Sequence, residues 1–310
     1  MNDKDKLHLH IYTSFFTQSH VYLKGRLLKN KPLTDKENNG ILKALFYTFL
    51  RAMSREITLQ KIECFVGNKK IEIVTDKEGY FELYENIEAM EGNDFSVINL
   101  KVNFKGQEKE QLVQLHDYSQ QVPVGIISDI DDTIMVTGVK SFFKLKVALN
   151  TLFLNPFRRK PIEDAAAAFH QLSDQVEGRG PVIYISNSPW NLYSYLKSFL
   201  QHNEFPKGIV LLRDMGWQLF KSRTLEDRNK YREIKKILIT FPTTEFILIG
   251  DSGELDFNIY QKVLQEHPDR IRKIIINKAG NKKKEEEILL HSQEHPNFEL
   301  IQGYSSLIEA

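Results

Sequence analysis

The second part of the chain, from about residue 122 onward, alternates short apolar runs with longer helical patterns. The apolar runs are VPVGIIS, PVIYIS, GIVLLR, EFILIG, RKIIIN and FELIQG. Between several of them lie stretches with helical periodicity, namely residues 161–174, 190–201, 229–241 and 255–267. Apolar strands separated by helices of 10–15 residues are typical of a parallel sheet with helices on both faces. We therefore predict a doubly wound α/β domain over residues 119–310.

The first part of the chain has a different pattern, in which polar and apolar residues alternate with period two. Runs such as SHVYLKGRLLKN, KIECFV and DFSVINLKVNF are punctuated by Asn, Gly and Asp. This pattern favours antiparallel strands. We predict a smaller β-sandwich-like domain over residues 1–118, with one inserted helix over residues 40–55. Residues 69–84 suggest a hairpin that turns at Asp76–Gly79, and residues 114–123 are the expected linker.

Composition narrows the functional classes. The 310 residues carry 42 Lys plus Arg against 41 Asp plus Glu, so no overall positive charge favours nucleic acid as a partner. The single cysteine, Cys64, excludes an internal disulfide and a Cys/His metal site, and its strand-like context predicts a buried apolar position. The start of the chain has no apolar signal region, and no run approaches the roughly 18 apolar residues of a membrane span. We expect a cytoplasmic protein.

Acidic residues follow two of the apolar runs directly. Asp129, Asp131 and Asp132 follow the first run in the sequence SDIDDT, and Asp251 follows EFILIG in the sequence GDSGELD. Ligands of open parallel sheets bind beyond the carboxyl ends of the strands, so these carboxylates should converge there. Carboxylates that repel one another ionise readily only with a cation between them, and oxygen ligands without His or Cys suit Mg²⁺. A helix N-cap would need one such side chain, not three.

A hydroxyl and an amine complete this set of polar side chains. Ser186 follows the run VIYI directly, although a serine there is also a common helix N-cap. Lys230 lies four residues before Ile234, on the apolar face of its predicted helix. A lysine on that face needs an anion or a path along which its ammonium group reaches water. A cation, an ionised carboxylate, a hydroxyl and an inward lysine together indicate a site for phosphoryl chemistry.

Four motifs occur in order on the expected elements and resemble those of the haloacid dehalogenase superfamily. They are DIDDT, Ser186 in YISNSPW, Lys230, and GDSGELD. A narrower resemblance includes GRLLKN, TDKEGYFEL, LFLNPFRRKP, LRDMGW and HPDRIRKIIIN. These segments are similar to the bacterial relatives of the actin-patch phosphatidate phosphatase family, whose catalytic domain resembles that of the lipins. The resemblance implies a Mg²⁺-dependent enzyme that removes phosphate from phosphatidate to give diacylglycerol.

Carried over by position, the resemblance assigns a role to each motif residue. Asp129 would be the nucleophile that forms an aspartyl-phosphate, and Asp131 the general acid and base. The expected metal ligands are Asp129, Asp131 (through its carbonyl) and Asp251. The expected phosphate contacts are Thr133, Ser186, Asn187 and Lys230, with Asp132 and Asp256 in supporting positions. The chain departs from many relatives at Asn229, where they carry His, and this puts any role of that His in substrate selection in doubt.

The substrate is less constrained than the chemistry. About fifty residues separate the first two motifs, which leaves no room for a large cap domain and implies an open site. Residues 142–160 interleave phenylalanines with lysines and arginines. They would suit peripheral contact with an anionic membrane, or the phenylalanines would pack on the sheet instead. A soluble phosphomonoester as substrate, or a non-catalytic lipid- or protein-binding relative, remain the alternatives. The sequence names no protein partner.

Overall fold

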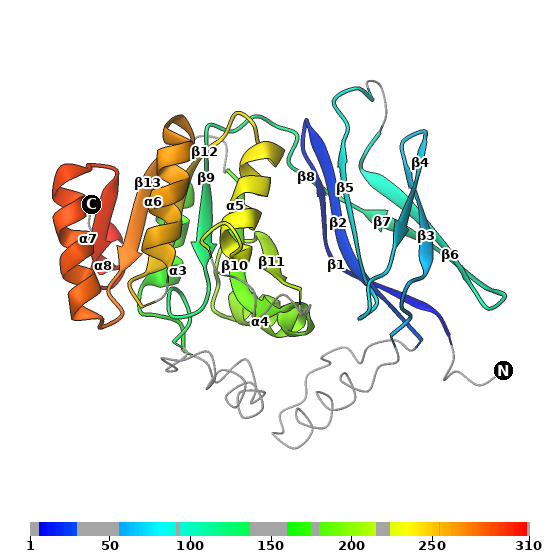
Figure 1. Cartoon of the computed structure of the whole chain (residues 1–310), viewed down its shortest axis with the longest axis horizontal. Helices are drawn as coiled ribbons and strands as arrows, with labels where there is room; N and C mark the ends of the chain where they lie inside the picture. Colours follow the sequence, from blue (N-terminus) through cyan, green and yellow to red (C-terminus); the bar gives the residue numbers. More distant parts are fainter. Residues whose placement is uncertain are drawn as a thin grey trace, which may run out of the picture. The chain divides into compact units, whose positions relative to one another are not determined.

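The computed structural model divides into two compact units, Met1–Gln120 and Gln121–Ala310 (Figure 1). The structure describes residues 6–29, 56–90, 94–136, 160–174, 180–214, 224–253 and 255–308. The predicted helix over residues 40–55 lies outside the described residues. Residues 142–160, except for Lys160, also lie outside the described residues. The expectation that the chain has no large cap depends mostly on this same region. Within the described parts, no helix is long and apolar enough to cross a membrane.

The first unit contains two four-stranded sheets, with strand orders β5-β2-β1-β8 and β4-β3-β6-β7. All their neighbouring strands are antiparallel except β1 and β8, which are parallel. The first sheet consists of β1 (His8–Phe16), β2 (His20–Leu28), β5 (Tyr80–Asn86) and β8 (His116–Asp117). The second consists of β3 (Lys61–Val66), β4 (Lys69–Val74), β6 (Val97–Phe104) and β7 (Gln107–Gln114).

Both sheets contribute to one apolar core. Leu23 and Phe81 come from the first sheet, and Cys64 and Leu100 come from the second. This is the sandwich arrangement that alternating sequences favour, because every second side chain of a strand faces the partner sheet. The prediction that Cys64 is buried is confirmed, and burial raises the pKa of its thiol to about 12.

The predicted hairpin over residues 69–84 is wrong, although its turn is present. The amide of Asp76 donates to the carbonyl of Tyr80, and the Asp76 carboxylate accepts from the amides of Glu78 and Tyr80. However, β4 pairs with β3 whereas β5 pairs with β2, so the turn carries the chain from one sheet to the other. Alternation of apolar residues cannot distinguish these two cases, because both strands face the same core.

The second unit is built on one parallel sheet with the order β11-β10-β9-β12-β13-β14. The predicted parallel sheet is therefore confirmed. Its strands are β9 (Val124–Asp129), β10 (Val182–Pro189), β11 (Ile209–Arg213), β12 (Glu245–Asp251), β13 (Ile271–Asn277) and β14 (Phe298–Ile301). All six residues of β9 are buried, as expected for a strand covered on both faces.

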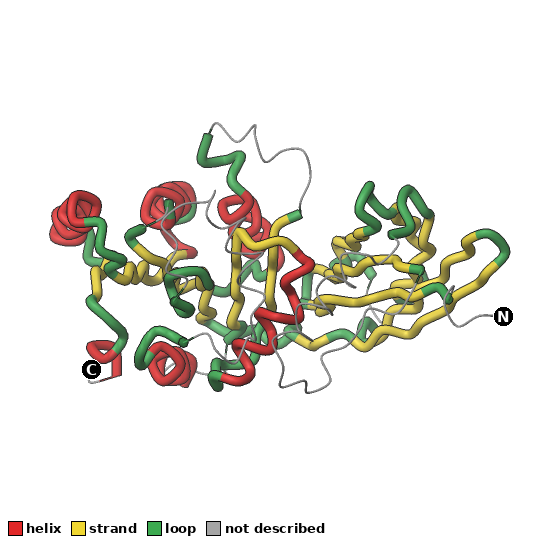
Figure 2. The backbone as a smooth tube through the Cα atoms, turned by 90° about the horizontal axis from the view of Figure 1, so that it is seen from below, coloured by secondary structure: helices red, strands yellow, loops and turns green. Residues whose placement is uncertain are grey.

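Helices lie on both faces of this sheet (Figure 2). They are α3 (Ala165–Asp174), α4 (Tyr193–His202), α5 (Asn229–Thr240), α6 (Asp256–Glu266), α7 (Lys282–Glu294) and α8 (Ser305–Ile308), with short 3₁₀ turns at Trp190–Leu192 and Pro268–Arg270. The chain runs outward from β9 to β11, then returns to β12 and continues in the opposite direction. The direction reverses between β9 and β12, and ligands of such sheets bind beyond the strand ends at this point.

Candidate active site

Three neighbouring strands bring the predicted site residues to one edge of the sheet. Asp129 ends β9 and lies opposite Ile185 of β10, directly before Ser186. On the other side, Ser128 lies opposite Ile249 of β12, two residues before Asp251. The strand ends that carry Asp129 and Asp251 therefore lie next to each other, on either side of the point where the strand order reverses. This convergence is what the sequence pattern predicts.

Asp129 is held by polar side chains on both of its carboxylate oxygens. Its side chain is 1% exposed. The ammonium group of Lys230 lies 2.8 Å from Oδ1, and the hydroxyl of Thr133 donates to Oδ2 at 3.1 Å. Thr133 reaches it because the turn after β9 folds back, with the amides of Ile134 and Met135 both donating to the carbonyl of Ile130. Lys230 and Thr133 thus fix the orientation of the carboxylate, and Lys230 places a positive charge beside it.

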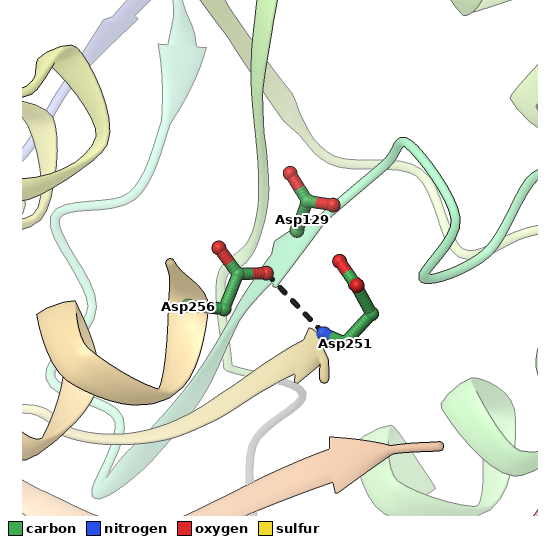
Figure 3. A group of neighbouring side chains, drawn as sticks. All are labelled: Asp129, Asp251 and Asp256. Carbon is green, nitrogen blue, oxygen red and sulfur yellow. Dashed lines mark hydrogen bonds between the residues drawn. The ribbon is translucent and has the colours of Figure 1, made fainter. Parts of the chain in front are cut away.

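Asp129, Asp251 and Asp256 form a compact group of buried carboxylates. One oxygen from each lies within 4.8 Å of the others, and Figure 3 shows the three side chains around a common space. The Asp251 amide donates to Asp256 at 3.3 Å, and the amide of Gly253 donates to Asp251 at 2.5 Å. Gly250 permits the approach of Asp256, because a Cβ there would lie 2.5 Å from one Asp256 oxygen.

Lys230 lies within this group rather than at the surface. It is 1% exposed and pairs with both Asp129 and Asp256. Its position on α5 follows from the helical repeat, which puts Lys230 on the same face as the buried Ile234. Three carboxylates and one ammonium group leave two net negative charges in a buried space. Such a donor set of oxygen atoms favours a hard divalent cation.

The Asp131 side chain faces a different partner, the hydroxyl groups at the end of β10. Ser186 donates to Asp131 Oδ2 at 2.7 Å, and Ser188 donates to the same oxygen at 3.4 Å. Ser186 also accepts a hydrogen bond from the amide of Ser188 at 2.9 Å. Burial raises the pKa of Asp131 above its usual value, with the nearby Asp132 adding to this, while the serines and Lys230 act in the opposite sense. A raised pKa makes a carboxyl group a better proton donor at a given pH.

The remaining predicted residues occupy the turn and the strand beside these groups. Asp132 has a positive φ of 58°, and its amide donates to the carbonyl of Met135, which identifies it as a turn residue. Asn187 is half-buried in β10 between the two serines, and its contact with phosphate stays a prediction. Asp256 was expected in a supporting position, and its carboxylate joins the buried group and pairs with Lys230.

Two further side chains at this site, Ser188 and Tyr304, are not among the predicted site residues. Ser188 hydrogen bonds to Asp131, and the second serine of SNSPW was the available signal. Tyr304 is fully buried and donates to the carbonyl of Thr133 at 2.9 Å. No local pattern identifies Tyr304, because it lies 171 positions along the chain from its partner.

Comparison with known proteins places this geometry in a family. Residues 124–278, half of the chain, match the family model described as the phosphatidate phosphatase APP1 catalytic domain. The chain belongs to this family. The match begins at the first residue of β9 and includes Asp129, Ser186, Lys230 and Asp251.

Two curated relatives agree with this assignment. The chain is 32% identical over 170 residues to phosphatidate phosphatase APP1 of Saccharomyces cerevisiae, which covers 53% of this chain and 27% of that protein. It is 29% identical over 241 residues to an uncharacterised protein of Schizosaccharomyces pombe, which covers 73% of this chain and 38% of the relative. The chain thus spans well under half the length of both relatives. Among solved structures, a carbohydrate acetylesterase from Xanthomonas citri aligns with 88% of this chain and 68% of its own, at 9% identity and a TM-score of 0.27, too low to show a shared fold.

Proposed function

We propose that this protein is a Mg²⁺-dependent phosphatase of the haloacid dehalogenase type, with phosphatidate as its leading substrate. The observation that carries the proposal is the division of the acidic residues into two groups. Asp129 pairs with Lys230 and accepts from Thr133, whereas Asp131 accepts from Ser186 and has a raised pKa. A fixed nucleophile and a separate proton donor are the two groups that phosphoryl transfer to a carboxylate requires.

In the proposed reaction, Asp129 attacks phosphorus and the bond to the leaving oxygen breaks. Asp131 gives its proton to that oxygen, which leaves as the alcohol. The resulting aspartyl-phosphate is then hydrolysed by a water from which Asp131 takes a proton, and this returns both residues to their starting states. Lys230 offsets the repulsion between the Asp129 carboxylate and the incoming phosphate. Ser186 exchanges its partner Asp131 for a phosphate oxygen when substrate binds.

The residues present fit the proposed Mg²⁺ ion. Buried carboxylates carry two net negative charges after Lys230 is counted, and all the donors are oxygen atoms. Asp129, Asp251 and the Asp131 carbonyl would hold the ion. Asp256 would instead position its neighbours, because its two oxygens already face Lys230 and the Asp251 amide. When bound, the ion neutralises charge on the phosphate.

The proposed substrate follows from the family. The yeast relative is a phosphatidate phosphatase by name, and the family model matches residues 124–278, which include the site. Because fold and family do not fix a substrate, a soluble phosphomonoester is the competing assignment. Peripheral contact of the protein with a membrane would accompany the lipid substrate.

A substrate panel tests both parts of the proposal. Phosphate release is measured for phosphatidate in mixed micelles and for soluble sugar phosphates and nucleotides, with Mg²⁺ or with a chelator. We expect phosphatidate to be hydrolysed fastest and only with Mg²⁺. Asp129→Asn should abolish turnover, because an amide is not a nucleophile towards phosphorus. The matched control is Asp269→Asn, which makes the same change at an exposed residue before β13, at the opposite edge of the sheet.

The two parts can fail separately. If the Asp129→Asn variant turned over substrate at the wild-type rate, this would contradict the role of Asp129 as the nucleophile. A soluble phosphomonoester hydrolysed tenfold faster than phosphatidate would contradict the lipid substrate and leave the chemistry standing. Phosphatase activity unaffected by the chelator would contradict the role of Mg²⁺.

A further inference from the structure

The C-terminal turn of the second unit contacts the turn that carries the proposed nucleophile. The hydroxyl of Tyr304 donates to the carbonyl of Thr133 at 2.9 Å, and the ring is fully buried. Thr133 in turn donates its own hydroxyl to Asp129. Two hydrogen bonds therefore connect the end of the chain to the Asp129 carboxylate, through one residue.

The same turn also contacts the end of β13, the strand that lies beside Asp251. The amide of Gly303 donates to the side-chain oxygen of Asn277 at 2.9 Å. Asn277 ends β13 opposite Asp251, and its carbonyl accepts the amide of Ser252 at 2.9 Å. Gly303 has a φ of 80°, a conformation that favours glycine and allows Gly303 and Tyr304 to face the two strand ends. Residues 303 and 304 thus link the segments that carry Asp129 and Asp251.

This turn is itself anchored by packing. The Tyr304 ring contacts Phe169 of α3 edge-on, with 6.1 Å between ring centroids, and α8 packs against α3 directly after the turn. Before the turn, β14 pairs with β13. Burial raises the pKa of Tyr304, and the carboxylates of Asp129, Asp251 and Asp256 raise it further, so its hydroxyl is a hydrogen-bond donor at neutral pH. Tyr304, β14 and α8 lie beyond the matched residues 124–278, whereas their partners α3 and β13 lie within them.

We propose that Tyr304 is a positioning residue for the nucleophile. By holding the Thr133 carbonyl, it fixes the turn after β9 and so the direction in which Thr133 presents Asp129 to the phosphate. Tyr304 touches neither the phosphate nor the metal. The inference rests on the proposed function, because it assigns Tyr304 a role in that site's reaction. It adds that turnover depends on a segment which the family match does not include.

The test compares two variants that each remove one buried hydroxyl. Tyr304→Phe removes the bond to Thr133. Tyr184→Phe is the matched control, since Tyr184 is also fully buried, donates to a backbone carbonyl (Pro206) at the same 2.9 Å, and packs on the same Phe169. Both variants should lose similar stability. The readouts are kcat and KM for phosphatase activity, and amide hydrogen exchange of residues 130–136, which needs no turnover.

We expect Tyr304→Phe to lower kcat roughly tenfold with KM within twofold, because a small displacement of a reacting group has effects of this order. Hydrogen exchange over residues 130–136 should be faster than in the wild type. Tyr184→Phe should match the wild type in both measurements. If Tyr304→Phe failed to fold, Gly303→Ala would strain the same turn, since φ is positive and no atom lies within 4 Å of its added Cβ. The same loss of kcat is expected.

The positioning role of Tyr304 and the proposed phosphatase function can be contradicted separately. Equal kcat and equal exchange in Tyr304→Phe and Tyr184→Phe would overturn the positioning role while wild-type activity leaves the function in place. Wild-type protein without phosphatase activity would overturn the function, and hydrogen exchange would then decide alone whether Tyr304 holds the turn.

Discussion

At the scale of single residues, neighbouring side chains with the same chemistry have different surroundings. Asp129 is ion-paired with Lys230, Asp131 accepts from Ser186, and Asp132 occupies a turn position with positive φ. In the proposed reaction, their surroundings rather than their residue type suit Asp129 for attack and Asp131 for proton transfer. Gly250 also contributes to the site, because the absence of a side chain there leaves the space that Asp256 fills.

Gly250→Ala should reduce activity without unfolding the protein. Its Cβ would lie 2.5 Å from an Asp256 oxygen and 2.7 Å from the Asp256 Cβ, so Asp256 or the backbone at residue 250 must shift, which should disturb the ion pair of Asp256 with Lys230. We expect kcat to fall by roughly tenfold or more, and the free energy of unfolding to fall by about 1–3 kcal/mol from overpacking. Steady-state kinetics and urea unfolding measure the two effects.

The control for this variant is Gly106→Ala. Gly106 lies in the turn between β6 and β7 at a φ of 79°, and no atom lies within 4 Å of an added Cβ. Alanine there costs backbone strain of about 1 kcal/mol and should leave kcat unchanged. Full activity in Gly250→Ala would show that the position of Asp256 is unimportant for turnover.

At the scale of elements, α5 determines where Lys230 lies, and α5 is fixed at both ends. Beside its first turn, the hydroxyl of Tyr231 donates to Glu266 of α6 at 2.6 Å. At its C-terminus, Arg270 donates to the carbonyls of Leu238, Phe241 and Thr244. The guanidinium group satisfies carbonyls that the end of a helix leaves without intrahelical partners, and its positive charge suits the negative end of the helix dipole.

Arg270→Ala should therefore lower stability and leave the chemistry intact. The variant removes charge-assisted hydrogen bonds to three carbonyls, and we expect the free energy of unfolding to fall by roughly 2 kcal/mol. Thermal unfolding followed by circular dichroism measures the change. Arg272→Ala is the control, because Arg272 is an exposed neighbour in β13. Equal melting temperatures for the two variants would contradict the capping role of Arg270.

At the scale of the molecule, the chain separates a β-sandwich from the unit that carries the site. The family match and every proposed catalytic or metal-binding residue lie in the second unit. The first unit has its own apolar core, which contains the chain's single cysteine, Cys64. Because that thiol is fully buried and its pKa is raised to about 12, it reports on whether this core is closed.

Thiol labelling during urea unfolding should follow the core of the first unit. Leu100→Ala removes a fully buried side chain opposite Cys64 and should lower the urea midpoint of labelling, with a loss of about 2–5 kcal/mol. Leu112→Ala changes a leucine that is 69% exposed and should leave the midpoint unchanged. Rapid labelling of Cys64 in native protein would contradict its burial.

Much of the second unit could be predicted from the sequence, because its strands and helices are specified by patterns of neighbouring residues. Continuous apolar runs predict strands covered on both faces, and the helical repeat predicts that Lys230 points inward. Polar residues directly after parallel strands must lie at one edge of the sheet. The approximate elements and the convergence of Asp129, Ser186, Lys230 and Asp251 follow from these rules.

Only the tertiary structure determined the contacts that join distant segments. Alternation could not tell whether β4 and β5 pair with each other or with strands of different sheets, since both arrangements bury the same side chains. The division of Asp131 from Asp129 depends on which hydroxyl reaches which oxygen, a matter of ångströms that spacing does not encode. Tyr304 reaches Thr133 only because β14 adds to the sheet and returns the chain to its acidic edge. Local patterns specify the elements, whereas the chemistry of the site depends on the packing that brings them together.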